Sequence, residues 1–189
     1  MRRGGSRLTA GEPLVRELAT AELDQEELRS IRALMDAAFD NDFSDDDMEH
    51  GLGGRHWLLD IDGRLVAHAS VVERRLEIDG RSFRAGYVES VGVAPDWQRR
   101  RLGSRVMAGA TAHIRDAYEL GALGTGEQPF YERLGWERWA GRSEVVERDG
   151  SRRHTADEDA WLMVLRTGPS TGVPLTGVLT CEWRPGDVW

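Results

Sequence analysis

The segment from Gly86 to Ser104 constrains the fold more than any other part of the chain. It reads GYVESVGVAPDWQRRRLGS, an alternating strand followed by a basic turn with a glycine at its end. Pro95 ends the strand because proline lacks the N–H group of a sheet ladder. Apolar residues then recur at helical spacing, at Leu102, Val106, Ala110, Ile114 and Ala117. A strand, turn and helix in this order offer main-chain N–H groups to a phosphate, so we expect an anionic ligand at the helix start.

The same strand carries a carboxylate. Counting by two places Tyr87, Glu89, Val91 and Val93 on one face. We therefore expect Glu89 to share its face with two valines.

Length and composition indicate one domain. The chain has 189 residues, enough for a full core, and we expect a flexible N-terminus over 1–10 and a single domain over 11–189. No apolar run approaches the roughly 18 residues of a membrane span, and the start lacks the apolar segment of a signal peptide, so we predict a cytoplasmic protein without a membrane partner. The net charge of −8 argues against nucleic acid and for a cationic partner or plain solubility.

Period and turn signals predict the remaining elements. Asp62-Gly63 and Asp79-Gly80 are hairpin turn pairs, and Asp24 with Glu27 has the spacing of a helix start. One helical face follows that start, with Leu28, Ile31, Met35, Ala38 and Phe39. We expect strands over 13–18, 56–61, 64–73 and 122–125, a short helix over 129–134, and a last hairpin that joins 145–148 to 161–165. These elements predict an α/β fold with a mixed sheet covered by helices.

An acidic stretch follows the first helix. Asp40 to Glu49 crowds carboxylates around Phe43 in what we expect to be a loop. Such a density of like charge is either a solvated surface or a site for a cation. The single cysteine, Cys181, excludes an internal disulfide and is expected to be buried on the last strand. The histidines lack the spacing of metal ligands, so we predict no metal site.

These motifs together resemble a known family. The turn is similar to the acyl-CoA pyrophosphate loop of the GNAT acetyltransferases, written Gln/Arg-x-x-Gly-x-Gly/Ala. Gln98, Leu102 and Gly103 match it, whereas Arg101 replaces the middle glycine and must adopt a left-handed turn at a cost of about 1 to 2 kcal/mol. Four further segments resemble the aminoglycoside 2′-N-acetyltransferases of that superfamily: Phe39-x-x-Asp42-Phe43, Asp47-x-Glu49-His50, Gly86-Tyr87-Val88-Glu89 and Trp183-Arg184-Pro185-Gly186-Asp187-Val188-Trp189.

The resemblance implies a GNAT acyl-CoA N-acyltransferase fold, with a central sheet whose strands splay apart, and acetyl-CoA as co-substrate. It places acetyl-CoA on the residues Val91, Gly92, Val93, Gln98, Arg99, Arg100, Arg101, Leu102, Gly103 and Ser104. It places a polycationic aminoglycoside on the residues Asp42, Asp47, Glu89, Ser90, Gly124, Glu158, Asp187 and Trp189. It further implies a homodimer and a tail that lines the drug site.

Two residues are the expected catalysts. An amine attacks a thioester only as the free base, while carboxylates that attract ammonium groups also raise their pKa, so a positioned carboxylate must take the proton. By resemblance Glu89 is this base, acting through water; the alternative is a glutamate that faces solvent or pairs with Arg84 or another arginine. Tyr131 resembles the acid that protonates the departing thiolate; the alternative is structural packing.

The expected function is acetyl transfer to the 2′-amine of an aminoglycoside, which confers drug resistance. Two alternatives remain open at this stage. One is acetylation of a peptide N-terminus or a polyamine, and the other is a non-catalytic acyl-CoA-binding module. Glycine at position 124 leaves only main-chain groups for substrate contact there.

Overall fold

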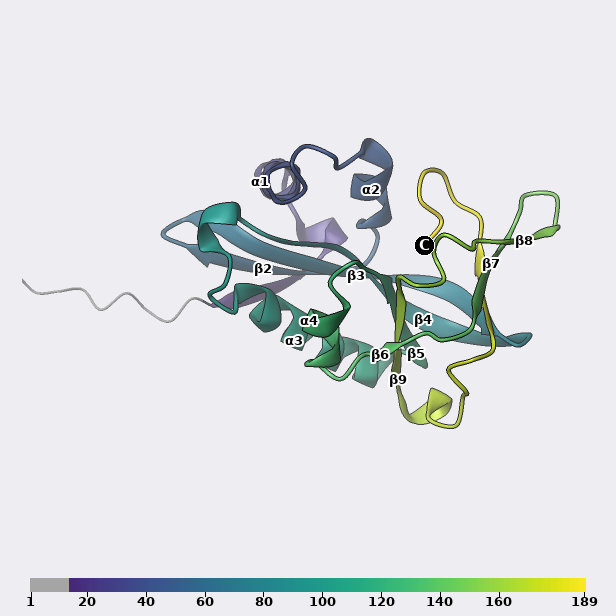
Figure 1. Ribbon diagram of the computed structural model, residues 1–189. Helices are drawn as coiled ribbons and strands as arrows, with labels where there is room; N and C mark the ends of the chain where they lie inside the picture. Colours follow the sequence, from purple (N-terminus) through teal and green to yellow (C-terminus); the bar gives the residue numbers. More distant parts are fainter. Residues whose placement is uncertain (1–13) are drawn as a thin grey trace, which may run out of the picture.

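The computed structural model describes residues 14–189 (Figure 1). The expected flexible segment 1–10 lies outside the described residues, as does Pro13, the expected start of the first strand. No helix among the described residues is long and apolar enough to cross a membrane.

Within 14–189, ten strands form one mixed sheet. They are β1 (Val15–Ala19), β2 (Arg55–Ile61), β3 (Arg64–Ile78), β4 (Arg81–Val93), β5 (Leu120–Gly124), β6 (Glu137–Arg138), β7 (Arg142–Val146), β8 (Arg152–His154), β9 (Leu162–Arg166) and β10 (Val178–Glu182). The main path runs β6-β9-β5-β4-β3-β10-β7-β8, while β2 joins β1 to the sheet at β3. β5 is parallel to β4 and β10 is parallel to β7, and the remaining pairs are antiparallel. The predicted α/β class with a mixed sheet is confirmed.

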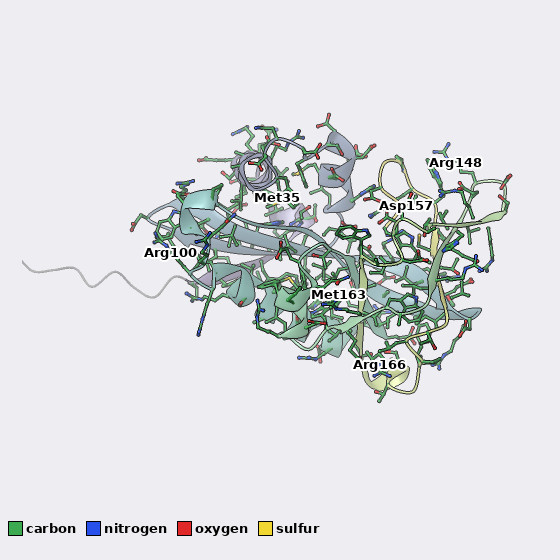
Figure 2. The ribbon with its side chains drawn as sticks, viewed as in Figure 1. Met35, Arg100, Arg148, Asp157, Met163 and Arg166 are labelled. Atoms are coloured by element: carbon green, nitrogen blue, oxygen red, sulfur yellow. The ribbon has the colours of Figure 1, made fainter. Side chains whose placement is uncertain are left out.

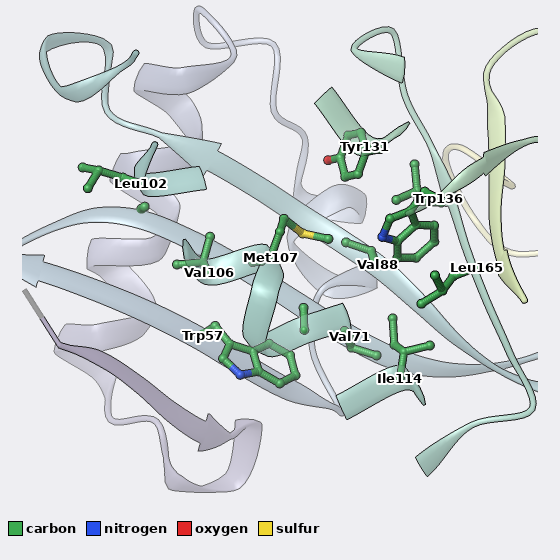
Figure 3. Close-up of a cluster of buried hydrophobic side chains, with 14 of the residues drawn as sticks. Trp57, Val71, Val88, Leu102, Val106, Met107, Ile114, Tyr131, Trp136 and Leu165 are labelled. Carbon is green, nitrogen blue, oxygen red and sulfur yellow. The ribbon is translucent and has the colours of Figure 1, made fainter. Parts of the chain in front are cut away.

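Helices cover both faces of this sheet (Figure 1). They are α1 (Gln25–Ala38), α2 (Asp45–His50), α3 (Leu102–Ala117) and α4 (Gln128–Glu132). α1 and α2 lie on one face, whereas α3 and α4 lie on the other. Figure 3 shows the core beneath α3, where Val106, Met107 and Ile114 pack against Trp57 and Val88. Leu102, the first residue of α3, is also buried, so apolar packing fixes the helix start.

Two of the predicted hairpins form, and the third does not. Asp62-Gly63 joins β2 to β3, and Asp79-Gly80 joins β3 to β4, with positive φ at all four residues, as type I′ turns require. The predicted pairing of 145–148 with 161–165 is wrong. β7 pairs with β8 around the turn after Val146. β9 pairs instead with β5 and β6, and this pairing buries its apolar residues in the central core.

The first helix begins as predicted and ends one residue early. Asp24 accepts hydrogen bonds from the main chain of Glu27 at 2.8 Å, and the Glu27 carboxylate accepts from the Asp24 N–H. Phe39 does not join the buried face, because the helix ends before it and its side chain is 42% exposed. The acidic stretch is not all loop: Ser44 caps α2, whose first turn holds three aspartates.

Candidate functional site

A β-bulge at Ser90 changes which side chains share a face. Between the two flanking pairs, β3 contributes one residue and β4 contributes two, Ser90 and Val91, and Ser90 has φ 49°. The extra residue reverses the alternation of side chains. Glu89 lies on the face of Tyr87, whereas Val91 and Val93 pack toward the α3 core. The expectation that Glu89 shares its face with two valines is therefore wrong.

A buried line of hydrogen bonds holds this bulge. The His68 Nδ1 lies 2.8 Å from the Ser90 carbonyl oxygen, the His68 Nε2 lies 3.0 Å from the His56 Nδ1, and the His56 Nε2 lies 2.7 Å from the Thr20 hydroxyl. Burial lowers the pKa of His56 to about 4 and that of His68 to about 3, so both rings are neutral at pH 7. A carbonyl only accepts, so His68 donates to Ser90, His56 donates to His68, and Thr20 donates to His56.

Sequence reasoning treated these histidines as scattered. His56 and His68 stand six residues before and six after Asp62. A hairpin centred there brings them close together on adjacent strands, so the turn signal contained this information.

Beyond the bulge, β4 has a free edge. Among the described strands, β5 pairs with β4 only at Ala85–Tyr87, and the strands then separate, as the resemblance implies. The main chain at Val91 and Val93 lies in this unpaired part. Close packing against α1 explains the glycine at position 92, because a Cβ there would lie 2.6 Å from the Met35 Cε. An unpaired strand edge can bind an extended chain of amides.

The basic turn at 98–101 is exposed and left-handed at two positions. Arg99 has φ 60° and Arg101 has φ 62°, which confirms the left-handed turn expected at Arg101. Arg101 is the N-cap of α3, and no side chain in the described part of the chain caps the helix. The guanidinium carbon of Arg100, which is labelled in Figure 2, lies 4.5 Å from the centroid of the Trp97 ring. This stacking holds the Arg100 side chain against Trp97. The first N–H groups of α3 are thus available to an anion.

Two neighbours of the turn fix its place. Gly103 lies close to β4, because a Cβ there would be 3.3 Å from the Val93 Cγ2 and 3.5 Å from the Phe130 ring. Gln98 begins the turn, and Ser104 lies in the first turn of α3. Tyr131 follows Phe130 on α4 and is largely buried, with its ring centroid 6.3 Å from that of Trp136 (Figure 3). Burial raises the pKa of the Tyr131 hydroxyl, which is therefore a protonated donor at pH 7.

Glu89 does pair with an arginine, although not with Arg84. The Arg184 Nη1 donates to the Glu89 Oε1 at 2.6 Å, and each side chain is only 14% exposed. Arg84 instead pairs with Glu73. The sequence analysis did not identify Arg184 as the partner of Glu89. The one indication was that Arg184 is the single basic residue in the tail segment 183–189.

The tail after β10 is anchored on the same face as Glu89. The indole N–H of Trp189 donates to the Thr155 hydroxyl at 2.8 Å, and Trp189 is buried. The Arg74 Nη2 donates to the Val188 carbonyl at 2.9 Å, and the His50 ring bonds the Pro185 carbonyl at 2.9 Å. The tail therefore joins α2, β3 and the 155–161 loop.

An unpartnered hydroxyl lies beside this tail. The Tyr87 Oη is buried and has no hydrogen-bond partner among the described residues. A Cβ built on Gly124 would lie 3.7 Å from this oxygen and 3.9 Å from the main-chain carbonyl carbon of Trp189. Gly124, Tyr87 and Trp189 thus meet at one point. The Ser90 hydroxyl is likewise buried without a partner.

The predicted acidic residues partly converge. Burial and then Asp187 raise the pKa of Glu158, which places these two carboxylates near each other. α2 abuts the tail, since a Cβ on Gly186 would lie 2.8 Å from the Asp46 Cβ. Asp47 also belongs to α2, but its carboxylate accepts from the Ser44 N–H at 2.8 Å and from the Ser44 hydroxyl.

Other acidic and aromatic residues have structural roles. Asp42 is exposed after the end of α1, and Phe43 is buried in the α1 core rather than free for a ligand. The Asp159 carboxylate accepts a hydrogen bond from the Ser143 N–H at 2.6 Å and lies 2.7 Å from the His154 Nε2, which gives it a structural role. Cys181 is buried on β10, as predicted, and burial raises its pKa to about 11.

Two negative findings limit the site. Residues 14–189 contain no group of three or more histidine, cysteine or carboxylate side chains arranged to hold a metal. A surface hollow of about 480 Å³ lies against Trp139, Arg142, Asp159 and Thr176, and none of the predicted site residues lines it.

Comparison with known proteins agrees with this geometry. Residues 20–139 match the model of the acetyltransferase (GNAT) domain. The chain is 41% identical over 191 residues to an aminoglycoside 2′-N-acetyltransferase of Mycolicibacterium fortuitum, covering 99% of this chain and 95% of that protein.

Solved structures show the same fold at low identity. The GNAT protein YhbS of Escherichia coli, in complex with CoA, has a TM-score of 0.63 at 14% identity and covers 89% of each chain. A GNAT acetyltransferase of Brucella melitensis, in complex with acetyl-CoA, has a TM-score of 0.58 at 17% identity and covers 88% of this chain and 94% of that one. With its splayed β4 and β5, its uncapped α3 and these matches, the chain belongs to the GNAT acetyltransferase family.

Proposed function

We propose that this protein transfers the acetyl group of acetyl-CoA to the 2′-amine of an aminoglycoside, a reaction that inactivates such drugs. The observation that carries the proposal is the convergence of carboxylates from α2, the tail and the 155–161 loop on the face where Glu89 lies. A substrate with several ammonium groups suits such a surface. The 41% identity to a protein named for this reaction supports the same substrate class.

The residues present fit acetyl-CoA, which supplies the activated acetyl group. The N–H groups at the start of α3 and the exposed Arg99 and Arg101 would hold its phosphates. The free edge of β4 at Val91 and Val93 would bind its amide-containing arm.

Two side chains would move protons. Glu89 accepts a proton from the attacking amine, directly or through a water. Tyr131, kept protonated by burial, donates a hydrogen bond or a proton to the departing thiolate. The unpartnered Tyr87 hydroxyl would contact the acceptor beside Gly124.

The test is thiol release from acetyl-CoA with a panel of amines. Turnover with 2′-amino aminoglycosides and none with their 2′-hydroxyl analogues is the expected result. Turnover of peptides or polyamines alone would refute the assignment in favour of a different acetyltransferase, and binding of acetyl-CoA without any turnover would indicate a non-catalytic module.

We also propose, on the family resemblance, that two copies pair as a homodimer. Equilibrium sedimentation tests this, and a monomer at micromolar concentration would refute it.

A further inference from the structure

The guanidinium of Arg184 lies beside the carboxylate of Glu89, the proposed base. Its Nη1 lies 2.6 Å from the Glu89 Oε1, and its Nε donates to the Asp187 carbonyl at 2.7 Å. Both charged side chains are 14% exposed, so water screens the pair weakly. Arg184 therefore links Glu89 to Asp187 of the tail.

The pair bears on a conflict within the proposed reaction. A lone carboxylate near a bound amine stabilises the ammonium form, which cannot attack a thioester. A second charge of opposite sign removes this effect. With Arg184 in place, Glu89 offers a proton acceptor in surroundings that do not favour an added positive charge.

The other charged and titratable groups around the pair strengthen this balance. They come from four elements: His50 on α2, Arg74 on β3, Tyr87 on β4 and Cys181 on β10. Burial and then Arg184 lower the pKa of His50, which adds no charge at pH 7. Arg74 contributes a second guanidinium, which lies 4.7 Å from the Tyr87 ring centroid and donates a hydrogen bond to the Val188 carbonyl of the tail.

The acidic excess lies further out. Within residues 14–189, Asp187, Glu158 and the α2 aspartates have no guanidinium partner of this kind, except Asp45, which binds Arg32. Figure 2 shows Asp157 in this outer region beside the tail.

We propose that Arg184 is a specificity-determining residue that neutralises Glu89, so that the outer carboxylates hold the ammonium groups of a polycationic acceptor while its reacting amine enters as the free base. This inference rests on the proposed function and deepens it. Arg184 acts through Glu89 and the bound amine, and is a positioning residue rather than a catalytic one.

The test is the pH dependence of kcat at saturating acetyl-CoA, since kcat reports groups in the enzyme–substrate complex. In Arg184→Gln the rising limb should shift to higher pH by about one unit, which makes kcat about tenfold lower at pH 7 and close to the wild type at pH 9. Arg184→Lys keeps the charge and should keep the wild-type limb. A loss that is equal at every pH would mean a merely structural role and would overturn the proposal.

A binding measurement gives a second readout without turnover. Calorimetry at pH 7 in two buffers of different ionisation enthalpy counts the protons released when the acceptor binds. The wild type should release more protons than Arg184→Gln, and equal release overturns the proposal. Arg166→Gln is the matched control: it breaks the 2.7 Å ion pair with Glu137, away from Glu89, and should change neither readout.

Two outcomes separate this inference from the proposed function. If the wild type acetylates no aminoglycoside, the proposed function fails, and the inference with it. If the wild type does so and Arg184→Gln has a parallel pH profile, the inference alone fails. Should Arg184→Gln not fold, as judged by circular dichroism, a shifted limb in Arg184→Lys overturns the inference and an unshifted limb supports it.

Discussion

Replacing Glu89 by glutamine tests the proposed base and its ion pair together. The amide keeps the shape of the side chain but cannot accept the proton, so kcat should fall about a hundredfold to ten-thousandfold. The change also leaves Arg184 without its charged partner in a region where both side chains are 14% exposed. Loss of one partner of a charged hydrogen bond costs about 1 to 3 kcal/mol of unfolding free energy. For a chain of this size, Tm should fall by about 2 to 4 °C for each kcal/mol.

The double variant Glu89→Gln with Arg184→Gln separates the two effects. Two neutral amides can hydrogen-bond to each other, so the double variant should regain most of the lost stability, whereas its kcat should remain low because no carboxylate is present. Urea denaturation and steady-state kinetics on the four proteins complete the cycle. Recovery of turnover in the double variant, or a near wild-type kcat in Glu89→Gln, would refute the reasoning that Glu89 is the base.

Four further results are expected. Arg101→Ala should raise the KM for acetyl-CoA more than that for the acceptor, and equal effects on both would contradict a phosphate contact. A peptide extension after Trp189 should weaken acceptor binding while acetyl-CoA affinity stays nearly constant, because Trp189 is buried; unchanged kinetic constants would contradict this. Gly109→Ala should destabilise the protein by about 1 to 3 kcal/mol in urea titrations, since the new Cβ would lie 2.4 Å from the Trp57 Cδ1, and Trp57→Phe should relieve the loss. Because the pKa of His68 is lowered in the folded state, the unfolded chain binds a proton at this residue first as the pH falls. The contribution of His68 to the free energy of unfolding should therefore be full above about pH 6.5 and should fall by up to about 1.4 kcal/mol per pH unit below it. A His68→Gln variant with the same dependence of stability on pH would contradict this.

Local signals predicted the parts of the fold that depend on local chemistry. The Asp62-Gly63 turn and the Asp24 cap were predicted from the sequence, because each depends on the φ or hydrogen-bonding preferences of a few adjacent residues, whereas the left-handed Arg101 followed from the family motif. The splayed β4 and β5 came from the family resemblance rather than from these signals.

Long-range pairing explains the failures. The partner of β9 depends on competition between β5 and β7 for the same apolar strand, which no local turn signal decides. The bulge at Ser90 reversed the face assignment of Val91, because alternation by two assumes an uninterrupted ladder. The contact between Glu89 and Arg184 spans 95 positions in the chain, and only the folded tail reveals it.

The line of hydrogen bonds from Thr20 to Ser90 also limits where the reaction's proton can go. A proton relay passes a proton only if each member can give one and accept another, and the Ser90 carbonyl has none to give. Reversing the line would need both rings to exchange tautomers with no donor at the inner end. His56 and His68 therefore support the bulge and do not form a proton relay. In the proposed reaction, the proton that Glu89 takes from the amine therefore has no route through His68 and His56.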